Sequence, residues 1–506
     1  MPDAVVLTGD SLTMPDVVRV ARELVSVHID DAAAARADES RAAVERIMET
    51  GQVIYGINTG FGRLANVRIA ASDLDQLQRN LILSHVAGVG DPLPIDVVRA
   101  MMLLRANVLL RETSGVRSIV ARRLVEALNA LIHPVVPEQG SVGASGDLAP
   151  LAHVAWAMFG EGEVTVGREG KDEGGTVRPA AEALREAGID PIAFAAKEGL
   201  AFINGTQAQT AILTLLVHDG RNLLRTATGA AAMSVEALLG TPVPFDERIQ
   251  AVRPHAGQGR IAAWLREFLA GSEIRESHRE GDPRVQDAYS LRCTPQILGA
   301  VADAVEYAAG VADVELNAST DNPLVFGDEV LSGGNFHGQP VALALDILTI
   351  GFTTLAGLAE RRLERLVNPE LSQGLPPFLA KNAGLNCGLM MVQITAASLV
   401  AESRTLSTPA SVQSVPTDAN QEDVVPMGMA AAFKARRVLG NAQRVVSCEL
   451  MAGAQGPEYR KPLAPGRGVQ RLYERVRTVF PPLSDDRPLS PDIEALSRLV
   501  AREALL

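Results

Sequence analysis

Five long runs rich in alanine, leucine and valine constrain the fold of this chain more than any other feature. They have few polar faces and little proline, and they lie at about residues 206–238, 295–318, 340–367, 384–407 and 427–453. Alanine and leucine are strong helix formers, and a helix that is apolar on most sides is buried among others. These runs predict a mainly α fold with a long central helical bundle.

Shorter patterns predict what surrounds the bundle. The segment 72–88 carries leucines at helical spacing and begins with Ser72 and Asp75, an S-x-x-D capping pattern. A last helix is predicted to begin with Ser490 as its cap and Pro491 at its first position. Strand-like signals are confined to short pieces such as VVLTG at 5–9 and EVTVG at 163–167.

Length and these patterns predict two parts. A chain of 506 residues exceeds the usual size of one core. We expect a smaller, mixed N-terminal part over residues 1–205, and the central bundle with a C-terminal helical region over 206–506.

Composition favours a small-molecule partner. The formal charge of −13, from 47 Lys and Arg against 60 Asp and Glu, argues against general binding to nucleic acid or anionic membranes. Three distant cysteines without a CxxC pair, and an N-terminus without a signal-peptide pattern, predict a cytoplasmic protein. The longest apolar region, 343–362, is interrupted by Asp346, so a membrane span is not expected.

The stretch GSVGASGDLAPLAH, from Gly140 to His153, places Ala144, Ser145 and Gly146 between further glycines and before an apolar run. A hydrolase elbow requires G-x-S-x-G, and here the second glycine comes one residue too early. The eight histidines form no HxxxH or HExxH pair, so no metal site is predicted. A tight turn with a helix cap is the plain structural alternative.

A second interpretation of this stretch is chemical. Gly146 has no side chain, so its backbone nitrogen can approach the carbonyl carbon of Ala144 and close a five-membered ring across Ser145. Loss of water, including the Ser145 hydroxyl, would leave an exocyclic methylene conjugated to the ring. Ala-Ser-Gly would then be an electrophilic cofactor made from the chain itself. Asp147 is interpreted as a helix-start residue that could also aid ring formation.

The stretch resembles the signature of the histidine and aromatic amino acid ammonia-lyases. In that family Ala-Ser-Gly becomes 4-methylidene-imidazol-5-one, and no external cofactor is implied. The resemblance covers nearly the whole chain, because further family motifs recur in order: YGINTGFG (55–62), NLILSHVAGVG (80–90), INGTQ (203–207), VQDAYSLRCTPQ (285–296), DNPLVFGDEVLSGGNFHGQP (321–340), GLPPFL (374–379) and ANQED (419–423).

The resemblance implies an ammonia-lyase (fumarase/aspartase-like) architecture and a homotetramer. Each active site would collect loops from three subunits, so an isolated subunit would be inactive. The reaction would remove ammonia and a β-hydrogen from an α-amino acid to give a conjugated enoic acid.

The resemblance also implies which residues form the active site, because they occupy matching positions in the family motifs. Tyr55 matches the base that takes the β-proton, and its phenol pKa of about 10 would have to be lowered by electropositive surroundings. Arg292 matches the residue that grips the substrate carboxylate, for which a planar guanidinium is suited. The residues that match those holding the prosthetic group or the amine, or packing near the ring, are Asn204, Gln286, Tyr289 and Phe336. Plain alternatives stay open: a surface charge for Arg292, a hydrogen-bonded strut for Gln286 and a core aromatic for Phe336.

Two positions favour histidine as the substrate. Ser84-His85 is similar to the Ser-His pair of histidine lyases and of some tyrosine aminomutases. Glu422 resembles a glutamate of histidine lyases, and a carboxylate can pair with an imidazole. Val424 and Pro426 instead lean toward the aromatic enzymes.

We therefore favour elimination of ammonia from histidine to give trans-urocanate. A tyrosine or phenylalanine ammonia-lyase or 2,3-aminomutase is the alternative. An inactive homologue that serves only in binding or as a scaffold is the remote one, which the intact Ala-Ser-Gly argues against.

Overall fold

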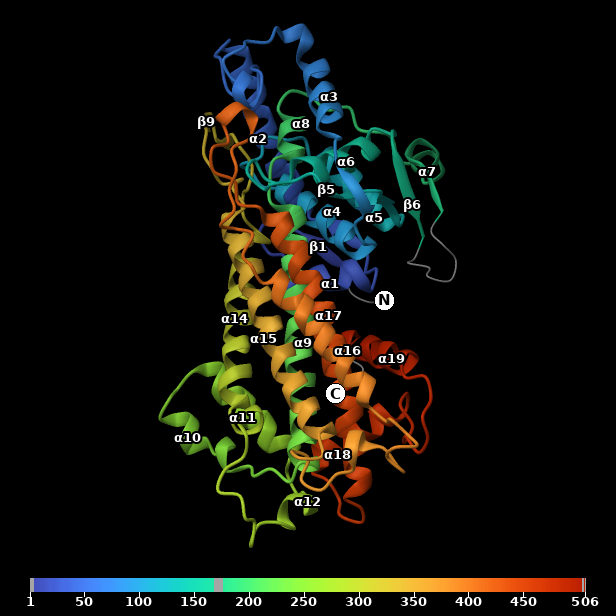
Figure 1. Cartoon of the computed structure of the whole chain (residues 1–506). Coiled ribbons are helices and arrows are strands. Elements are labelled where there is room, and N and C mark those ends of the chain that lie inside the picture. Colours follow the sequence, from blue (N-terminus) through green and yellow to red (C-terminus); the bar gives the residue numbers. More distant parts are fainter. Residues whose placement is uncertain (1–3, 168–175, 503–504, 506) are drawn as a thin grey trace. The chain divides into compact units, whose positions relative to one another are not determined.

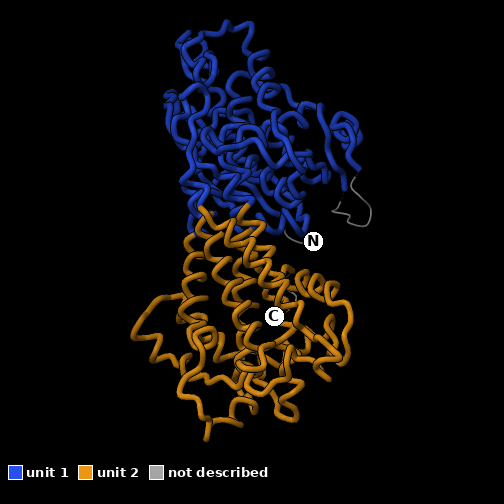
Figure 2. Tube along the Cα trace, in the orientation of Figure 1, with its two compact units in different colours: residues 1–215, 308–345, 409–433 blue, residues 216–307, 346–408, 434–506 orange. Residues whose placement is uncertain are grey.

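The computed structural model describes residues 4–167, 176–502 and 505. The chain forms two compact units, each built from three separate segments (Figure 2). Unit 1 contains residues 1–215, 308–345 and 409–433, and unit 2 contains residues 216–307, 346–408 and 434–506. The single boundary expected between residues 205 and 206 stays a prediction. The compact units are defined by contacts between segments that are far apart in the sequence. A division at one point along the chain cannot describe such units.

Each of the five predicted runs contains a long helix, so the prediction of a mainly α fold built on a helical bundle is confirmed (Figure 1). The helices are α9 (Gln207–Ala237), α14 (Thr294–Glu315), α15 (Gln339–Val367), α16 (Met390–Leu406) and α17 (Gly428–Gln455).

Close packing and one buried ion pair join these helices within unit 2. A Cβ added at Gly220 of α9 would stand 2.8 Å from the ring of Phe352 on α15, so glycine lets the two helices approach closely. Arg362 of α15 and Glu449 of α17 are fully buried and form an ion pair with an Nε–Oε1 distance of 2.5 Å. Ser234 of α9 donates a hydrogen bond to the same carboxylate oxygen at 2.7 Å.

Helix α15 is the one described helix that is long and apolar enough to cross a membrane by length and composition. Its most apolar window is 67% buried within the protein itself, as expected of a core helix that meets the same test.

Unit 2 also contains shorter helices around the bundle segments. They are α10 (Glu247–Ala251), α11 (Ala256–Phe268), α12 (Glu273–Glu276), α13 (Tyr289–Arg292), α18 (Arg467–Arg477) and α19 (Ser490–Ala501).

Unit 1 combines helices with small sheets. Its strands pair as β1 (Val5–Leu7) with β2 (Val27–Ile29), β3 (Val89–Pro92) with β5 (Pro137–Gln139), β8 (Leu324–Phe326) with β9 (Glu329–Leu331), and β4 (Ile132–Pro134), β6 (Glu163–Val166) and β7 (Val177–Pro179) in one antiparallel sheet. The strands expected in VVLTG and EVTVG are therefore present as β1 and β6.

The core of unit 1 is built around α4 (Ile95–Leu109), which packs against α1 (Met14–Arg22) and α5 (Ser118–Asn129). Every α4 residue from Val97 to Leu109 is buried, including Arg99 and Arg105. The remaining helices of unit 1 are α2 (Asp31–Glu49), α3 (Leu74–His85), α6 (Leu148–Met158), α7 (Ala180–Glu186) and α8 (Glu198–Ile203).

Both predicted helix caps are wrong in detail. The helix expected from Ser72 begins at Leu74, because residues 71–73 form a 3-10 turn in which the Ser72 hydroxyl donates to Asp73. Ser490 is the first residue of α19, and that helix has no side-chain cap bond. Local patterns locate helices to within a turn, whereas hydrogen bonds at the ends depend on the neighbouring backbone.

Candidate active site

Ala144, Ser145 and Gly146 lie in a tight turn between β5 and α6. Gly146 makes an antiparallel bridge to Gly143 and a parallel bridge to Gly205. The φ of Gly146 is +78°, and an added Cβ would overlap the backbone of Gly205. Both facts require glycine at position 146.

Asn204 holds the centre of this turn. Its Nδ2 donates a hydrogen bond of 2.7 Å to the Ser145 carbonyl oxygen. The buried Arg105 donates from Nη1 to the Asn204 carbonyl at 3.1 Å and to Gln207 Oε1 at 2.8 Å. Burial lowers the pKa of Arg105 to about 10, so the guanidinium remains charged at neutral pH. A buried cation on α4 therefore fixes the backbone beside the triad.

Asp147 follows the triad and is fully buried. The Ser141 hydroxyl donates to its Oδ1 and the Gln209 backbone nitrogen to its Oδ2, each at 2.9 Å. Asp147 precedes α6, as predicted for a helix-start residue, but its carboxylate caps the first turn of α9 and makes no cap bond to α6. Burial raises the pKa of Asp147 to about 6, against the opposing effect of these hydrogen bonds.

A cavity of about 490 Å³ opens beside the turn, entirely within unit 1. Four separate stretches of the chain line it, with the residues Tyr55, Gly62, Ala65, Ala144, Ser145, Asn322, Ser332, Gly333, Phe336, His337, Asp418, Gln421, Glu422, Asp423 and Val424. The cavity therefore brings together Tyr55, Ala144, Ser145, Phe336 and Glu422 from the predicted set, and Asn204 and Gly146 adjoin it through the turn.

The carboxylate of Glu422 is held at both oxygens. Ser145 Oγ donates to its Oε1 at 2.5 Å and Thr417 Oγ1 donates to its Oε2 at 2.6 Å. The loop between Thr417 and Glu422 has three successive left-handed residues, Asp418 to Asn420, with φ of 46°, 50° and 65°. Non-glycine residues seldom adopt this conformation, and such strain is concentrated at functional sites.

Tyr55 faces the same loop. Its hydroxyl accepts a hydrogen bond of 3.4 Å from the Gly62 nitrogen. Burial raises the pKa of Tyr55, and the carboxylates of Asp418 and Glu422 raise it further, against the lowering effect of the Gly62 bond. Within one chain, the expectation of electropositive surroundings is therefore wrong, because the charged groups facing the phenol are acids.

Five other predicted residues do not line this cavity. Ser84 and His85 end α3, where the His85 ring nitrogen Nδ1 lies 2.7 Å from the Leu81 carbonyl oxygen. Gln286 and Arg292 line a separate pocket of about 820 Å³ in unit 2. The Arg292 guanidinium lies 4.6 Å from the ring centroid of Tyr289, whose side chain is exposed.

The sequence reasoning missed three residues of the site. Thr417 and Asp418 begin the loop that leads to Glu422, and Asp418 accepts a hydrogen bond of 3.0 Å from the Arg63 nitrogen. His337 lies 3.1 Å, through Nε2, from the Val424 carbonyl oxygen. His337 lies within the motif at 321–340, and Thr417 and Asp418 directly precede the motif at 419–423. Their position beside family motifs is the only sequence signal that could have indicated them.

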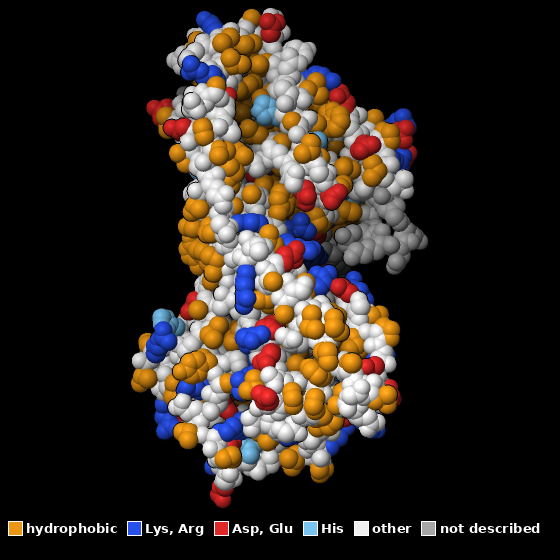
Figure 3. Space-filling view, in the orientation of Figure 1, with side chains coloured by type: hydrophobic (Ala, Val, Ile, Leu, Met, Phe, Trp, Pro, Cys, Tyr) orange, Lys and Arg blue, Asp and Glu red, His pale blue; other side chains and the backbone are white. Residues whose placement is uncertain are grey.

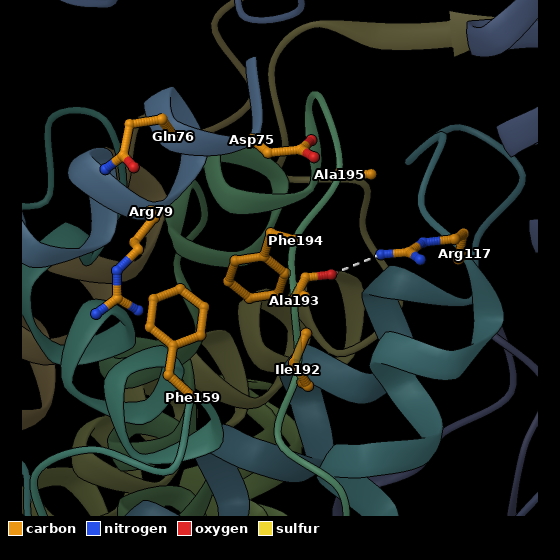
Figure 4. A pocket seen from close by; sticks show the side chains of 9 residues that line it. All are labelled: Asp75, Gln76, Arg79, Arg117, Phe159, Ile192, Ala193, Phe194 and Ala195. Carbon is orange, nitrogen blue, oxygen red and sulfur yellow. Dashed lines mark hydrogen bonds between the residues drawn. The ribbon is translucent and has the colours of Figure 1, made fainter. Parts of the chain in front are cut away.

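A second pocket of unit 1, of about 430 Å³, is a weaker candidate. Figure 4 shows the rings of Phe159 and Phe194 beside Arg79, with Arg117 opposite. Both arginines are paired with carboxylates, Arg79 with Glu161 and Arg117 with Glu198, each at 2.6 Å. Its remaining charged residue, Asp75, is exposed, and none of its residues adjoins the Ala-Ser-Gly turn, so the cavity at Ser145 is the candidate active site. Over residues 4–167, 176–502 and 505, no group of three or more His, Cys, Asp or Glu side chains could hold a metal ion.

Known proteins resemble this chain over its whole length. Residues 12–478 match the family model described as aromatic amino acid lyase. A histidine ammonia-lyase of Anaeromyxobacter dehalogenans (strain 2CP-C) is 50% identical over 506 residues, covering 99% of this chain and 99% of the relative.

Solved structures agree with this assignment. The crystal structure of histidine ammonia-lyase from Trypanosoma cruzi superposes with a TM-score of 0.91 at 42% identity, covering 99% of this chain and 94% of the other. A tyrosine aminomutase from Streptomyces globisporus gives a TM-score of 0.93 at 38% identity, covering 99% and 98%. With its Ala-Ser-Gly turn facing a cavity that also holds a tyrosine and a glutamate, this chain belongs to the aromatic amino acid lyase family.

Proposed function

We propose that this protein is a histidine ammonia-lyase, a carbon–nitrogen lyase that converts L-histidine to trans-urocanate and ammonia. Identity to relatives of that name over the full chain supports the proposal. The observation that carries it is the carboxylate of Glu422 at the Ala-Ser-Gly turn, since a carboxylate is the natural partner of an imidazole.

The cofactor in this proposal is 4-methylidene-imidazol-5-one, formed from Ala144, Ser145 and Gly146. The residues present fit it: position 146 admits no side chain, and Asn204 holds the Ser145 carbonyl oxygen, which would become the carbonyl oxygen of the ring. When formed, this group supplies an electrophilic carbon that captures the substrate amine and makes it a leaving group.

The chain's own side chains then have distinct roles. Tyr55 takes the β-proton. Burial and two carboxylates of the same chain raise the pKa of its phenol, so we expect cationic neighbours from another subunit to lower it. Glu422 binds the imidazole, held in place by Thr417. Phe336 lines the same cavity, where an aromatic side chain would help to exclude water.

Assembly into a homotetramer would supply the missing cations. Arg292, Tyr289 and Gln286 are proposed to complete the active site of another subunit, where Arg292 grips the substrate carboxylate. On the face drawn in Figure 3, exposed hydrophobic side chains lie among the charged side chains on both units. Large apolar side chains exposed on three bundle helices support burial between copies, namely Tyr307, Val314, Leu343, Ile350, Met391 and Ile394.

A cytoplasmic location belongs to the same proposal. Cys293, Cys387 and Cys448 are free thiols, as expected in a reducing compartment.

The test is a parallel assay of the purified protein with L-histidine, L-tyrosine and L-phenylalanine. Ammonia release is followed and the products are identified by NMR. Urocanate from histidine alone is expected. Coumarate, cinnamate or a β-amino acid would refute the choice of substrate or of reaction. Val424 and Pro426, rather than Glu422, would then be the residues that indicate the substrate.

A Ser145→Ala variant tests the cofactor directly. The intact wild-type chain should be two waters lighter than its sequence mass, and the variant should lose both this deficit and most of its turnover. Full turnover by the variant would contradict a cofactor made from the triad.

A further inference from the structure

The unmodified triad makes a contact that catalysis by the mature enzyme does not require. Before the ring forms, the Ser145 hydroxyl donates a hydrogen bond of 2.5 Å to Glu422 Oε1. The other carboxylate oxygen is held by Thr417 at 2.6 Å, and the Thr417 nitrogen donates to the Glu422 carbonyl at 2.9 Å. The carboxyl group is thus fixed against the one oxygen atom that must leave the serine side chain.

We propose that Glu422 acts during formation of the cofactor, as the acid that assists departure of the Ser145 hydroxyl. The inference rests on the proposed cofactor and adds a second role for this side chain. Once the hydroxyl has left, Oε1 loses its partner and becomes available to the substrate. One carboxyl group would then serve first in maturation and later in binding.

The chemistry balances in two steps. Ring closure joins the Gly146 nitrogen to the Ala144 carbonyl carbon and expels the Ala144 oxygen as water, with protons from the backbone nitrogens of Ser145 and Gly146. In the second step the Cα–H and Cβ–Oγ bonds of Ser145 break. The C–H electron pair forms the new double bond, and its proton passes to solvent. The Glu422 carboxylate first takes a proton from solvent, so that the carboxyl then donates to Oγ. The leaving oxygen takes this proton, so a second water leaves, the carboxylate is restored and no oxidant is needed.

Other ionisable groups near the triad are engaged elsewhere. The carboxylate of Asp147 accepts hydrogen bonds from Ser141 and Gln209, and the Tyr55 hydroxyl bonds to the Gly62 nitrogen. Among the residues that the structure describes, Glu422 alone has a side-chain hydrogen bond to Ser145 Oγ. Geometry therefore selects Glu422 over its acidic neighbours.

The test is a time course of intact mass after cell-free synthesis of the full chain. Glu422→Gln keeps the size of the side chain but removes its acid. We expect its second dehydration to be slower on the order of 100-fold, in the range of a positioned general acid. A species one water lighter than the sequence mass should accumulate, and peptide mapping should locate the retained hydroxyl at Ser145. Glu422→Asp, which keeps a carboxyl group, should mature faster than Glu422→Gln.

Asp423→Asn is the matched control, because it removes an adjacent, exposed carboxylate that lines the same cavity without a bond to Ser145. It should mature at the wild-type rate. Maturation of Glu422→Gln at the wild-type rate would overturn the inference. If circular dichroism shows that Glu422→Gln is unfolded, Thr417→Val replaces it. Loss of that one hydrogen bond should slow maturation about fivefold, and an unchanged rate would overturn the inference equally.

The two proposals fail in different ways. A wild-type chain that stays at its sequence mass would remove the cofactor itself. A wild-type chain two waters lighter, with an equally mature Glu422→Gln, would leave the cofactor and remove only the role of Glu422.

Discussion

The buried ion pair between Arg362 and Glu449 should be a major determinant of the stability of unit 2. Both side chains have no exposed surface, and the guanidinium donates from Nε and Nη2 to the two carboxylate oxygens at 2.5 and 2.8 Å. Glu449→Ala would leave a buried arginine without its counter-charge and the Ser234 hydroxyl without its acceptor. Removal of one partner of such a pair costs about 3–5 kcal/mol, so the free energy of unfolding should fall by about that amount.

The measurement is equilibrium unfolding in urea, followed by circular dichroism at fixed protein concentration. Glu494→Ala is the matched control, because its partner Arg444 is also on α17 but both side chains of this pair are partly exposed, at 44% and 35%. Its loss should cost less than about 1 kcal/mol. The double variant Arg362→Met/Glu449→Leu should recover most of the lost stability, since apolar residues of similar volume can replace a buried pair. A cost for Glu449→Ala no larger than that of the control would refute the reasoning.

Three further predictions concern single residues. Tyr55→Phe should fold and mature normally but turn over on the order of 100-fold more slowly or worse in a steady-state assay, and a wild-type rate would exclude Tyr55 as the base. Gly146→Ala should keep its full sequence mass, because the left-handed φ and the overlap with Gly205 prevent the turn that ring closure needs; a chain two waters lighter would contradict this. Burial raises the pKa of Glu236 from 4.5 to about 7, so the folded protein binds the proton more tightly than the unfolded chain. Its contribution to stability is present below about pH 4.5 and is lost as the pH rises to about 7, and Glu236→Gln should flatten urea-unfolding stability over that interval; an unchanged slope would reject this assignment.

The helical bundle was predictable because each run carries its own evidence. Alanine and leucine favour helix locally, and the predicted runs agree with α9, α14, α15 and α17 to within three residues at either end. The start of α16 was placed too early, because residues before Met390 form turns held by hydrogen bonds such as Leu389 N to the Phe378 carbonyl. That acceptor is remote from the run itself, so helix propensity could not reveal it.

The candidate site was likewise predictable only in part. The chemistry proposed for Ala144, Ser145 and Gly146 follows from their covalent structure, and Glu422 was recognised through its motif. The roles of Thr417 and Asp418 depend on a left-handed loop of non-glycine residues, which no local preference predicts. Within one chain, the carboxylates beside Tyr55 could not be anticipated, because Asp418 is hundreds of residues away along the chain.

By itself, the amino-acid sequence determined the helical class, the family resemblance and the presence of the Ala-Ser-Gly triad, since each depends on residues close together in the chain. Only the tertiary structure decided which side chains surround the triad. It placed the Glu422 carboxyl on the Ser145 hydroxyl, the Asp147 carboxylate on the first turn of α9, and carboxylates rather than cations beside Tyr55. These contacts join distant segments, and their hydrogen bonds and pKa shifts arise from burial and proximity that exist only after the chain has folded.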